Sequence, residues 1–184
     1  ATLTPNVGLA RGTTYTETVS ASDLAGNAMT PVSSVFTTAQ PSPQPGVCPC
    51  SLWDDAATPA VITVNDSATV ELGIKFSTDI AGSITGVRFY KGTGNGGTHT
   101  ASVWTLDGTR LATVTFTQET QRGWQRAAFS TPVAIAAGTA YVVSYYAPQG
   151  HYAADLSFFA APLDTGVLHA SRVANGLYRY GASG

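Results

Sequence analysis

Aromatic side chains are the residues of this sequence with the most distinctive chemistry. A sugar ring presents an apolar C–H face, and an exposed Trp or Tyr offers a flat surface that matches it. The alternative is that the same aromatics fill the space between two β-sheets. We expect a ligand-binding surface that combines aromatic residues with two loop histidines, namely Trp53, Tyr90, His99, Trp104, Tyr146, His151 and Tyr152.

The two histidines of this set lie in two loops. His99 belongs to the Gly-rich segment 92–100, and His151 to the segment 148–152. We expect the two loops to form one rim of a binding groove. The alternatives are a metal site, which would require two histidines close to an aspartate, and a structural role in which the imidazole donates to a backbone carbonyl.

Carboxylates cluster near the start of the second module. Asp54, Asp55 and Asp66 flank the first expected strand, and Glu71 lies in the next one. Hard oxygen ligands of this kind suit Ca²⁺, which takes about six to eight of them. The sequence has no D-x-D-x-D-G loop, and turn or strand-edge roles are the alternative. Calcium is therefore a weak candidate, and we otherwise expect no cofactor.

The two cysteines, Cys48 and Cys50, are separated by one residue. A C-x-C pair with no third or fourth ligand nearby cannot close a tetrahedral metal site, and a thioredoxin-like motif needs C-x-x-C. We expect either a local disulfide or two thiols that pin a linker to the second module. A disulfide would imply an oxidising compartment.

Enzyme motifs such as G-x-S-x-G, H-E-x-x-H and the Walker A sequence are absent. Glycoside hydrolysis needs two carboxylates across a cleft. The glutamates Glu17, Glu71 and Glu119 belong to no aromatic cleft motif. We therefore expect no enzymatic activity.

The composition is poor in charge. Charged residues make up 11% of the 184, against about 25% in an average soluble protein. A net charge of -2 with scattered Lys and Arg argues against nucleic acid as a partner, and no apolar run reaches the roughly 20 residues of a membrane helix. The chain opens on a strand-like segment instead of a signal peptide, which we interpret as truncation.

Short strands at regular spacing predict an all-β protein with an antiparallel, jelly-roll-like β-sandwich from residue 51 to 184. The predicted strands of this module are 60–64, 70–76, 83–90, 100–105, 111–117, 125–129, 140–146, 152–159 and 177–180. No segment has a sustained helical period, so we expect negligible helix.

The first 39 residues contain two predicted strands, 14–20 and 32–38, around the turn signal Asp23–Asn27. This part contains three distinctive sequence motifs, Arg-Gly-Thr-Thr-Tyr-Thr-Glu-Thr-Val, Asp-Leu-Ala-Gly-Asn and Val-Phe-Thr-Thr. Together they resemble the last strands of a bacterial Ig-like domain, which is a β-sandwich spacer without catalytic residues. We expect residues 1–39 to be the end of such a domain. The Pro-rich segment 40–50 is interpreted as a semi-rigid linker.

The second module resembles the bacterial extracellular domain of unknown function 4082. The resemblance rests on words such as Val70-Glu-Leu-Gly-Ile-Lys-Phe76, Ile84-Thr-Gly-Val-Arg-Phe-Tyr-Lys-Gly92 and Ala147-Pro-Gln-Gly-His-Tyr152. It implies a module of a large secreted protein and assigns no catalytic site. Relatives continue into one more strand, so we expect the module to lack its last strand.

These observations predict a non-catalytic, extracellular module of a large secreted or cell-surface bacterial protein with a spacer or adhesion role. The alternative is a carbohydrate-binding module attached to a secreted polysaccharide-active enzyme. Its partners would be a polysaccharide or cell-surface glycan and the neighbouring domains of the same chain. A Gly-Thr-x-Tyr word precedes a strand at both Tyr15 and Tyr141, and each tyrosine is expected to tie a sandwich edge to its own backbone.

Overall fold

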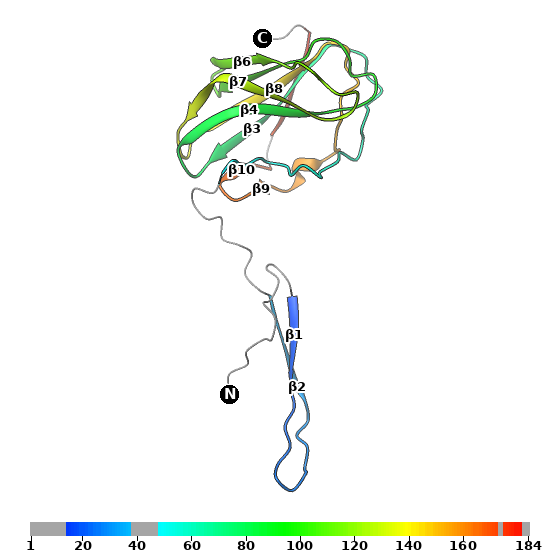
Figure 1. The fold of residues 1–184 in the computed structure, drawn as a ribbon, viewed down its shortest axis with the longest axis vertical. Coiled ribbons are helices and arrows are strands. Elements are labelled where there is room, and N and C mark those ends of the chain that lie inside the picture. The colour runs from blue at the N-terminus through cyan, green and yellow to red at the C-terminus, as the bar shows by residue number, and fades with distance from the viewer. Residues whose placement is uncertain (1–13, 38–47, 173–174, 182–184) are drawn as a thin grey trace. The chain divides into compact units, whose positions relative to one another are not determined.

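The computed structural model describes residues 14–37, 48–172 and 175–181 and divides the chain into two units, Ala1–Gln44 and Pro45–Gly184 (Figure 1). Residues 40–47 of the predicted linker lie outside the described residues. Within the described part no helix is long and apolar enough to cross a membrane.

The first unit is a β-hairpin. Strand β1 (Thr14–Val19) pairs antiparallel with β2 (Val32–Thr37), as predicted from the sequence. Tyr15 stacks on Phe36 across the pair, with ring centroids 5.9 Å apart. In the turn, the Asp23 carboxylate accepts hydrogen bonds from the side-chain amide of Asn27 and from the backbone N–H groups of Asn27 and Ala25. The Asn27 side-chain bond, followed by the backbone bonds, lowers the pKa of Asp23. The Asx turn therefore closes the hairpin.

The second unit consists of short strands and one short 3₁₀ helix. In chain order they are β3 (Val70–Thr78), β4 (Gly82–Lys91), β5 (Thr100–Thr105), β6 (Arg110–Thr115), β7 (Gly123–Ile135), β8 (Ala140–Ala147), η1 (Phe158–Ala160), β9 (Leu163–Asp164), β10 (Leu168–Ala170) and β11 (Gly176–Tyr180).

The central strands pair like a long hairpin that has folded over on itself. Strand β5 pairs with β6, β4 with β7, and β3 with β8, all antiparallel. The pairs β3–β8 and β5–β6 belong to a seven-stranded large sheet, ordered β6-β5-β8-β3-β10-β9, in which β11 also pairs with β3. Strands β4 and β7 form the small sheet. The predicted all-β antiparallel sandwich is confirmed, and the nesting is that of a jelly-roll-like fold.

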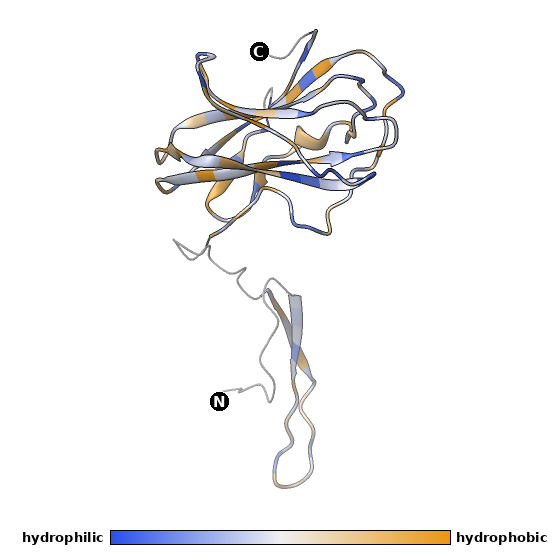
Figure 2. Cartoon of the chain, turned by 45° about the horizontal axis from the view of Figure 1, so that its top comes forward, coloured by the Kyte–Doolittle hydropathy of each residue, from blue (hydrophilic) through white to orange (hydrophobic). Residues whose placement is uncertain are grey.

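The register of the large sheet separates its two faces. Leu72 pairs with Tyr145, Ile74 with Val143, and Phe76 with Tyr141. Because paired residues in a sheet share a face, these side chains form the inner face, and the residues between them face outward. Figure 2 shows the resulting mixture of hydrophobic and hydrophilic residues along the strands.

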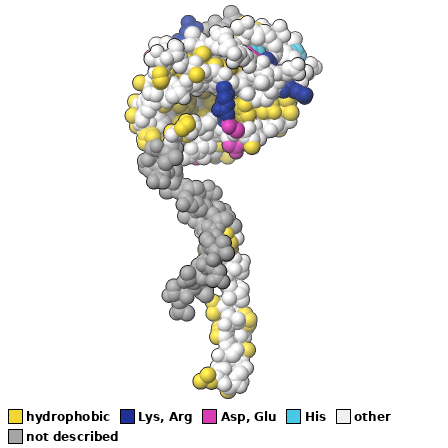
Figure 3. Space-filling model, in the orientation of Figure 1, with side chains coloured by type: hydrophobic (Ala, Val, Ile, Leu, Met, Phe, Trp, Pro, Cys, Tyr) yellow, Lys and Arg dark blue, Asp and Glu magenta, His cyan; other side chains and the backbone are white. Residues whose placement is uncertain are grey.

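Two clusters of side chains make the core. One gathers around Leu52, Phe76, Tyr141 and Ala170, and the other around Phe89, Ala101 and Phe116. Phe89 of the small sheet stacks on Tyr145 of the large sheet with ring centroids 4.3 Å apart. This contact joins the two layers. The face shown in Figure 3 carries few charged side chains, as the 11% charged composition requires.

Two of the predicted strands, 60–64 and 152–159, are wrong. These segments meet in an isolated bridge between Val61 and Ala154, residues 158 and 159 begin η1, and the remaining residues run as loops. Extended structure ends there because His151 and Ser157 adopt a positive φ. The short strands β9 and β10 were missed because two or three residues carry no periodic signal.

The Tyr141 side chain holds the turn that precedes β8. It is buried, and its hydroxyl accepts a hydrogen bond of 3.0 Å from the backbone N–H of Ala136. This is the corner geometry predicted from the Gly-Thr-x-Tyr word.

Replacing Tyr141 by Phe removes this acceptor and leaves the ring in place. We expect the free energy of unfolding to fall by about 1 kcal/mol, the usual net contribution of one hydrogen bond, measured by urea denaturation. The matched control is Tyr146→Phe on the same strand, whose effect should stay within about 0.5 kcal/mol. Equal stability of the Tyr141→Phe variant and the wild type would contradict the corner role.

Candidate functional site

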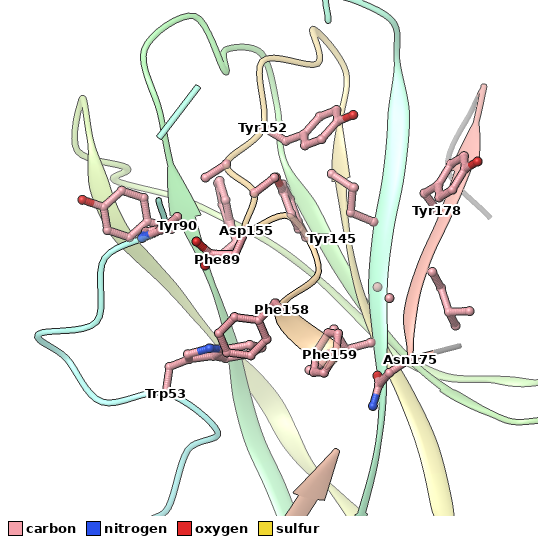
Figure 4. A pocket seen from close by; sticks show the side chains of 18 of the residues that line it. Trp53, Phe89, Tyr90, Tyr145, Tyr152, Asp155, Phe158, Phe159, Asn175 and Tyr178 are labelled. Carbon is pink, nitrogen blue, oxygen red and sulfur yellow. The ribbon is translucent and has the colours of Figure 1, made fainter. Parts of the chain in front are cut away.

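An open groove of about 1160 Å³ lies between the sheets, beside β4 on one side and β3 and β11 on the other (Figure 4). The inner faces of the two sheets supply most of its apolar lining. These residues are Leu72, Ile74, Val87, Phe89, Val143 and Tyr145. Burial raises the pKa of the Tyr145 phenol above its ordinary value. The lining is thus mainly aliphatic and aromatic, with a minority of polar side chains such as Asp155, Arg172 and Asn175.

Three of the predicted ligand-binding residues line this groove. They are Trp53, Tyr90 and Tyr152, which the fold brings from three separate segments (Figure 4). Trp53 packs against Phe158 of η1, with ring centroids 5.7 Å apart. The exposed Tyr178 of β11 completes the aromatic rim. Sequence reasoning missed it because an aromatic in a short edge strand has no distinctive neighbour pattern.

Arg88 ties the segment before β3 to the outer side of β4. Its guanidinium donates to Asp55 at 2.5 Å and to the carbonyl oxygen of Trp53, and it lies 4.3 Å from the ring centroid of Trp124. Arg126 also donates to Asp55. The Arg88 hydrogen bond, followed by that from Arg126, holds the pKa of Asp55 below its usual value. Asp55 is therefore an ion-pair partner in this structure.

Asp66 holds together the loops beside the start of β3. Its carboxylate accepts hydrogen bonds from the backbone N–H of Ala68 and from the hydroxyls of Tyr180 and Tyr152. The Ala68 and Tyr180 hydrogen bonds lower the pKa of Asp66, and the same carboxylate raises the pKa of Tyr180 to about 12. The backbone carbonyl of Asp66 also accepts the N–H of His151 at 2.6 Å.

The structure corrects the expectation that His99 lines a binding groove. Its side chain is fully buried and donates from Nδ1 to Glu119, which also accepts from Lys91 at 2.7 Å. Desolvation lowers the pKa of His99 in spite of this carboxylate. A neutral ring that donates from Nδ1 needs a donor at Nε2, and the Asn95 amide, 2.8 Å away, supplies one when its NH₂ group faces the ring. That orientation also pairs the otherwise unsatisfied Nδ2 of Asn95.

The two histidine loops do meet, but they pack against each other. A Cβ built on Gly94 would lie 3.2 Å from the ring of His151, and one on Gly97 would lie 2.7 Å from Pro148. His151 donates from Nδ1 to the carbonyl oxygen of Val64 at 3.3 Å. His151 therefore anchors a loop. Glycines are needed here because a side chain would separate the two loops.

Trp104 and Tyr146 lie together on the outer face of the large sheet, away from the groove. Trp104 donates from Nε1 to the Ser144 hydroxyl at 2.8 Å, and Ser144 donates to Glu71 at 2.6 Å. Since Glu71 pairs with Tyr146 in the sheet register, the two aromatics stand at either end of this polar row. We call Trp104, Ser144, Glu71 and Tyr146 the outer platform. Arg110 of β6 lies beside it, with its guanidinium carbon 5.5 Å from the centroid of the Trp104 ring.

The four carboxylates proposed for calcium do not assemble. Asp54 accepts the backbone N–H of Ala56, Asp55 binds two arginines, Asp66 binds tyrosine hydroxyls, and Glu71 belongs to the outer platform. Among the described residues, no three His, Cys, Asp or Glu side chains gather as a metal site. Each of the four carboxylates is thus engaged by a different set of partners. The structure joins Cys48 to Cys50 by a disulfide.

One ionisable cluster was not recognised from the sequence. His169 of β10 has Nδ1 2.7 Å from Asp164 of β9 and Nε2 2.8 Å from Asp79, which follows β3. The hydrogen bond that His169 donates to Asp164, followed by the one it donates to Asp79, raises the pKa of His169. Asp164 and His169 are paired by the hairpin of β9 and β10, whose two- and three-residue strands give no periodic signal in the sequence.

The His169 cluster predicts a pH dependence of stability. A histidine whose pKa is higher in the folded than in the unfolded protein stabilises the fold. Its contribution to the free energy of unfolding is complete at pH values below the unfolded pKa of about 6.5, and it is lost as the pH rises through the folded pKa. We expect His169→Gln to lower the free energy of unfolding by about 0.2–1 kcal/mol at pH 6, and by less at pH 9. Urea denaturation at the two pH values measures this difference. Asp164→Asn should show the same trend, and an equal loss at both pH values for both variants would contradict the assignment.

Comparison with known proteins gives a family for most of the chain. The model of the family described as "Domain of unknown function (DUF4082)" matches residues 56–184, which is more than half of the chain. No curated protein and no solved structure matched. The match covers the large sheet, the small sheet, the groove and the outer platform. The chain therefore belongs to the family of the domain of unknown function DUF4082.

Proposed function

We propose that the second unit is a non-catalytic carbohydrate-binding module that attaches a large secreted or cell-surface bacterial protein to a polysaccharide or cell-surface glycan. The observation behind this proposal is the outer platform, where the Trp104 indole is held over the sheet by Ser144 beside polar side chains. An indole fixed in this way stacks on a sugar ring with little loss of conformational entropy.

The chemistry of the platform suits sugar better than that of the groove. A carbohydrate needs an apolar surface for its ring face together with donors and acceptors for its hydroxyls. Glu71, Tyr146 and Arg110 offer such groups around Trp104. The groove instead presents Leu72, Ile74 and other apolar side chains, against which sugar hydroxyls would lose hydrogen bonds to water.

Two other features of the chain support an extracellular, adhesive role. A disulfide links Cys48 to Cys50, and such bonds persist in oxidising compartments. The proposed role of residues 1–39 is that of a spacer, as the end of a bacterial Ig-like domain. The ligand is bound by stacking and hydrogen bonds, so the proposal needs no cofactor and no catalytic residue.

A glycan array with purified protein tests this function. We expect sub-millimolar binding to at least one polysaccharide, without release of reducing sugars. Calorimetry with that ligand should show that Trp104→Ala weakens binding at least about tenfold, or about 1.4 kcal/mol, and that Tyr146→Ala also weakens it.

The matched control is Tyr178→Ala, which removes an exposed aromatic from β11 and should leave glycan affinity unchanged. Circular dichroism and thermal melting establish that each variant is folded. Absence of any glycan ligand, or wild-type affinity in a folded Trp104→Ala variant, would defeat the proposal.

A further inference from the structure

The small sheet ends in an open edge. It has two strands, β4 and β7, opposite a large sheet of seven. Along the side of β4 that faces away from β7, no backbone hydrogen bond is made within the described part of the chain. Unpaired N–H and C=O groups in an extended row are a template for a further strand.

The groove beside this edge has the shape and polarity that a strand requires. Val87–Tyr90 of β4 line one side, while Leu72 and Ile74 of β3 and Tyr178 of β11 line the other. A strand next to β4 would direct every second side chain toward these apolar residues. The six residues Gly86–Lys91, which follow the bulge in β4, extend over about 20 Å, enough to pair with a short strand.

Two arginines that line the groove have unused donors. The Arg88 side chain is only 10% exposed, and its Nε is buried without a hydrogen-bond partner. Arg172 is exposed and makes no hydrogen bond or ion pair with the residues that the structure describes. A buried donor without an acceptor costs free energy. The groove is therefore complementary to an occupant that brings carbonyl oxygens and a carboxylate.

We propose that the groove is a docking site for an extended strand of a partner polypeptide, with alternating apolar side chains and an acidic residue near its end. The strand pairs with β4 and becomes the third strand of the small sheet. Its inward side chains cover Leu72, Ile74 and Tyr178. Its carbonyl oxygens accept from the free N–H groups of β4, and the acidic residue pairs with Arg172.

A sugar chain and a second copy of this protein are the competing occupants. A sugar lacks the regular N–H and C=O groups that β4 needs, and most of the groove lining is apolar. A second copy would have to present its own β4 edge, so that two arginine-lined grooves would approach each other. Both are outcomes that the experiment below separates.

The test is fluorescence anisotropy with labelled Asp-Thr-Val-Thr-Val-Thr-Val-Thr-Asp, a peptide with an alternating pattern and an acid at each end. We expect a dissociation constant of about 10–100 μM and slowed amide hydrogen exchange at residues 86–91. A peptide with proline at the central Thr positions lacks strand donors and should bind at least tenfold more weakly. A peptide of the same composition, in which the three Val residues stand next to one another, should also bind more weakly.

Variants of the protein locate the site. Tyr178→Lys should weaken peptide binding at least fivefold, while the matched control Leu106→Lys, an exposed apolar residue in the β5–β6 turn, should not. Arg172→Glu should reverse the charge preference of the groove. This variant should bind a peptide with Lys in place of both Asp residues more tightly than the Asp peptide. Trp104→Ala should leave peptide affinity unchanged, which separates this site from the outer platform.

Three results would overturn the proposal. The first is equal binding of the alternating and proline peptides. The second is displacement of the bound peptide by the glycan that binds the outer platform. The third is a concentration-dependent dimer in analytical ultracentrifugation that Tyr178→Lys abolishes, which would make a second copy the occupant.

Discussion

The antiparallel pairing of β3 with β8 is the constraint on which both binding surfaces depend. Its register places Tyr145 opposite Leu72 on the inner face and Tyr146 opposite Glu71 on the outer face. A slip of one residue would exchange the faces of a strand. A slip of β8 would turn Ser144 and Tyr146 toward the core and Val143 and Tyr145 outward, so the register is selected by the core as a whole. The buried corner tyrosine on β8 fixes where that strand begins.

The two faces of the large sheet then carry different chemistry. Inward, aliphatic and aromatic side chains pack against Phe89 of the small sheet wherever β4 and β7 reach. Beyond the edge of β4 the same inner face lines the groove. Outward, the hydrogen-bonded row from Trp104 to Glu71 has no apolar neighbour layer in the described part of the chain. One sheet thus presents an apolar surface suited to polypeptide and a polar aromatic surface suited to sugar.

The sequence predicted what depends on local pattern and missed what depends on the meeting of distant segments. Alternation located the central strands and placed Tyr145 and Tyr146 on opposite faces, because the side-chain period of a strand is two. Local chemistry likewise identified the Asp23 turn and the Tyr141 corner. It misplaced His99, since a histidine in a Gly-rich loop looks exposed until Glu119, from another segment, and Asn95, from the same loop, bind its two ring nitrogens. The loop 152–159 was read as a strand because its alternation is real, whereas the positive φ of Ser157 is not visible in composition.

The low charge of the chain explains where its ionised groups are found. Charged side chains make up 11% of the residues, and several of them join segments that no sheet hydrogen bond connects. Asp55 and Arg88 fasten the entry segment to β4, Asp66 holds β11 through Tyr180, and His169 links β10 to Asp79. Loops without a ladder need directional contacts to have one conformation. Because charges are used at these junctions, the outer platform has one charged member, Glu71, and most of the groove lining is uncharged. Recognition by such surfaces relies on stacking, apolar contact and backbone pairing, which salt screens far less than it screens exposed charges.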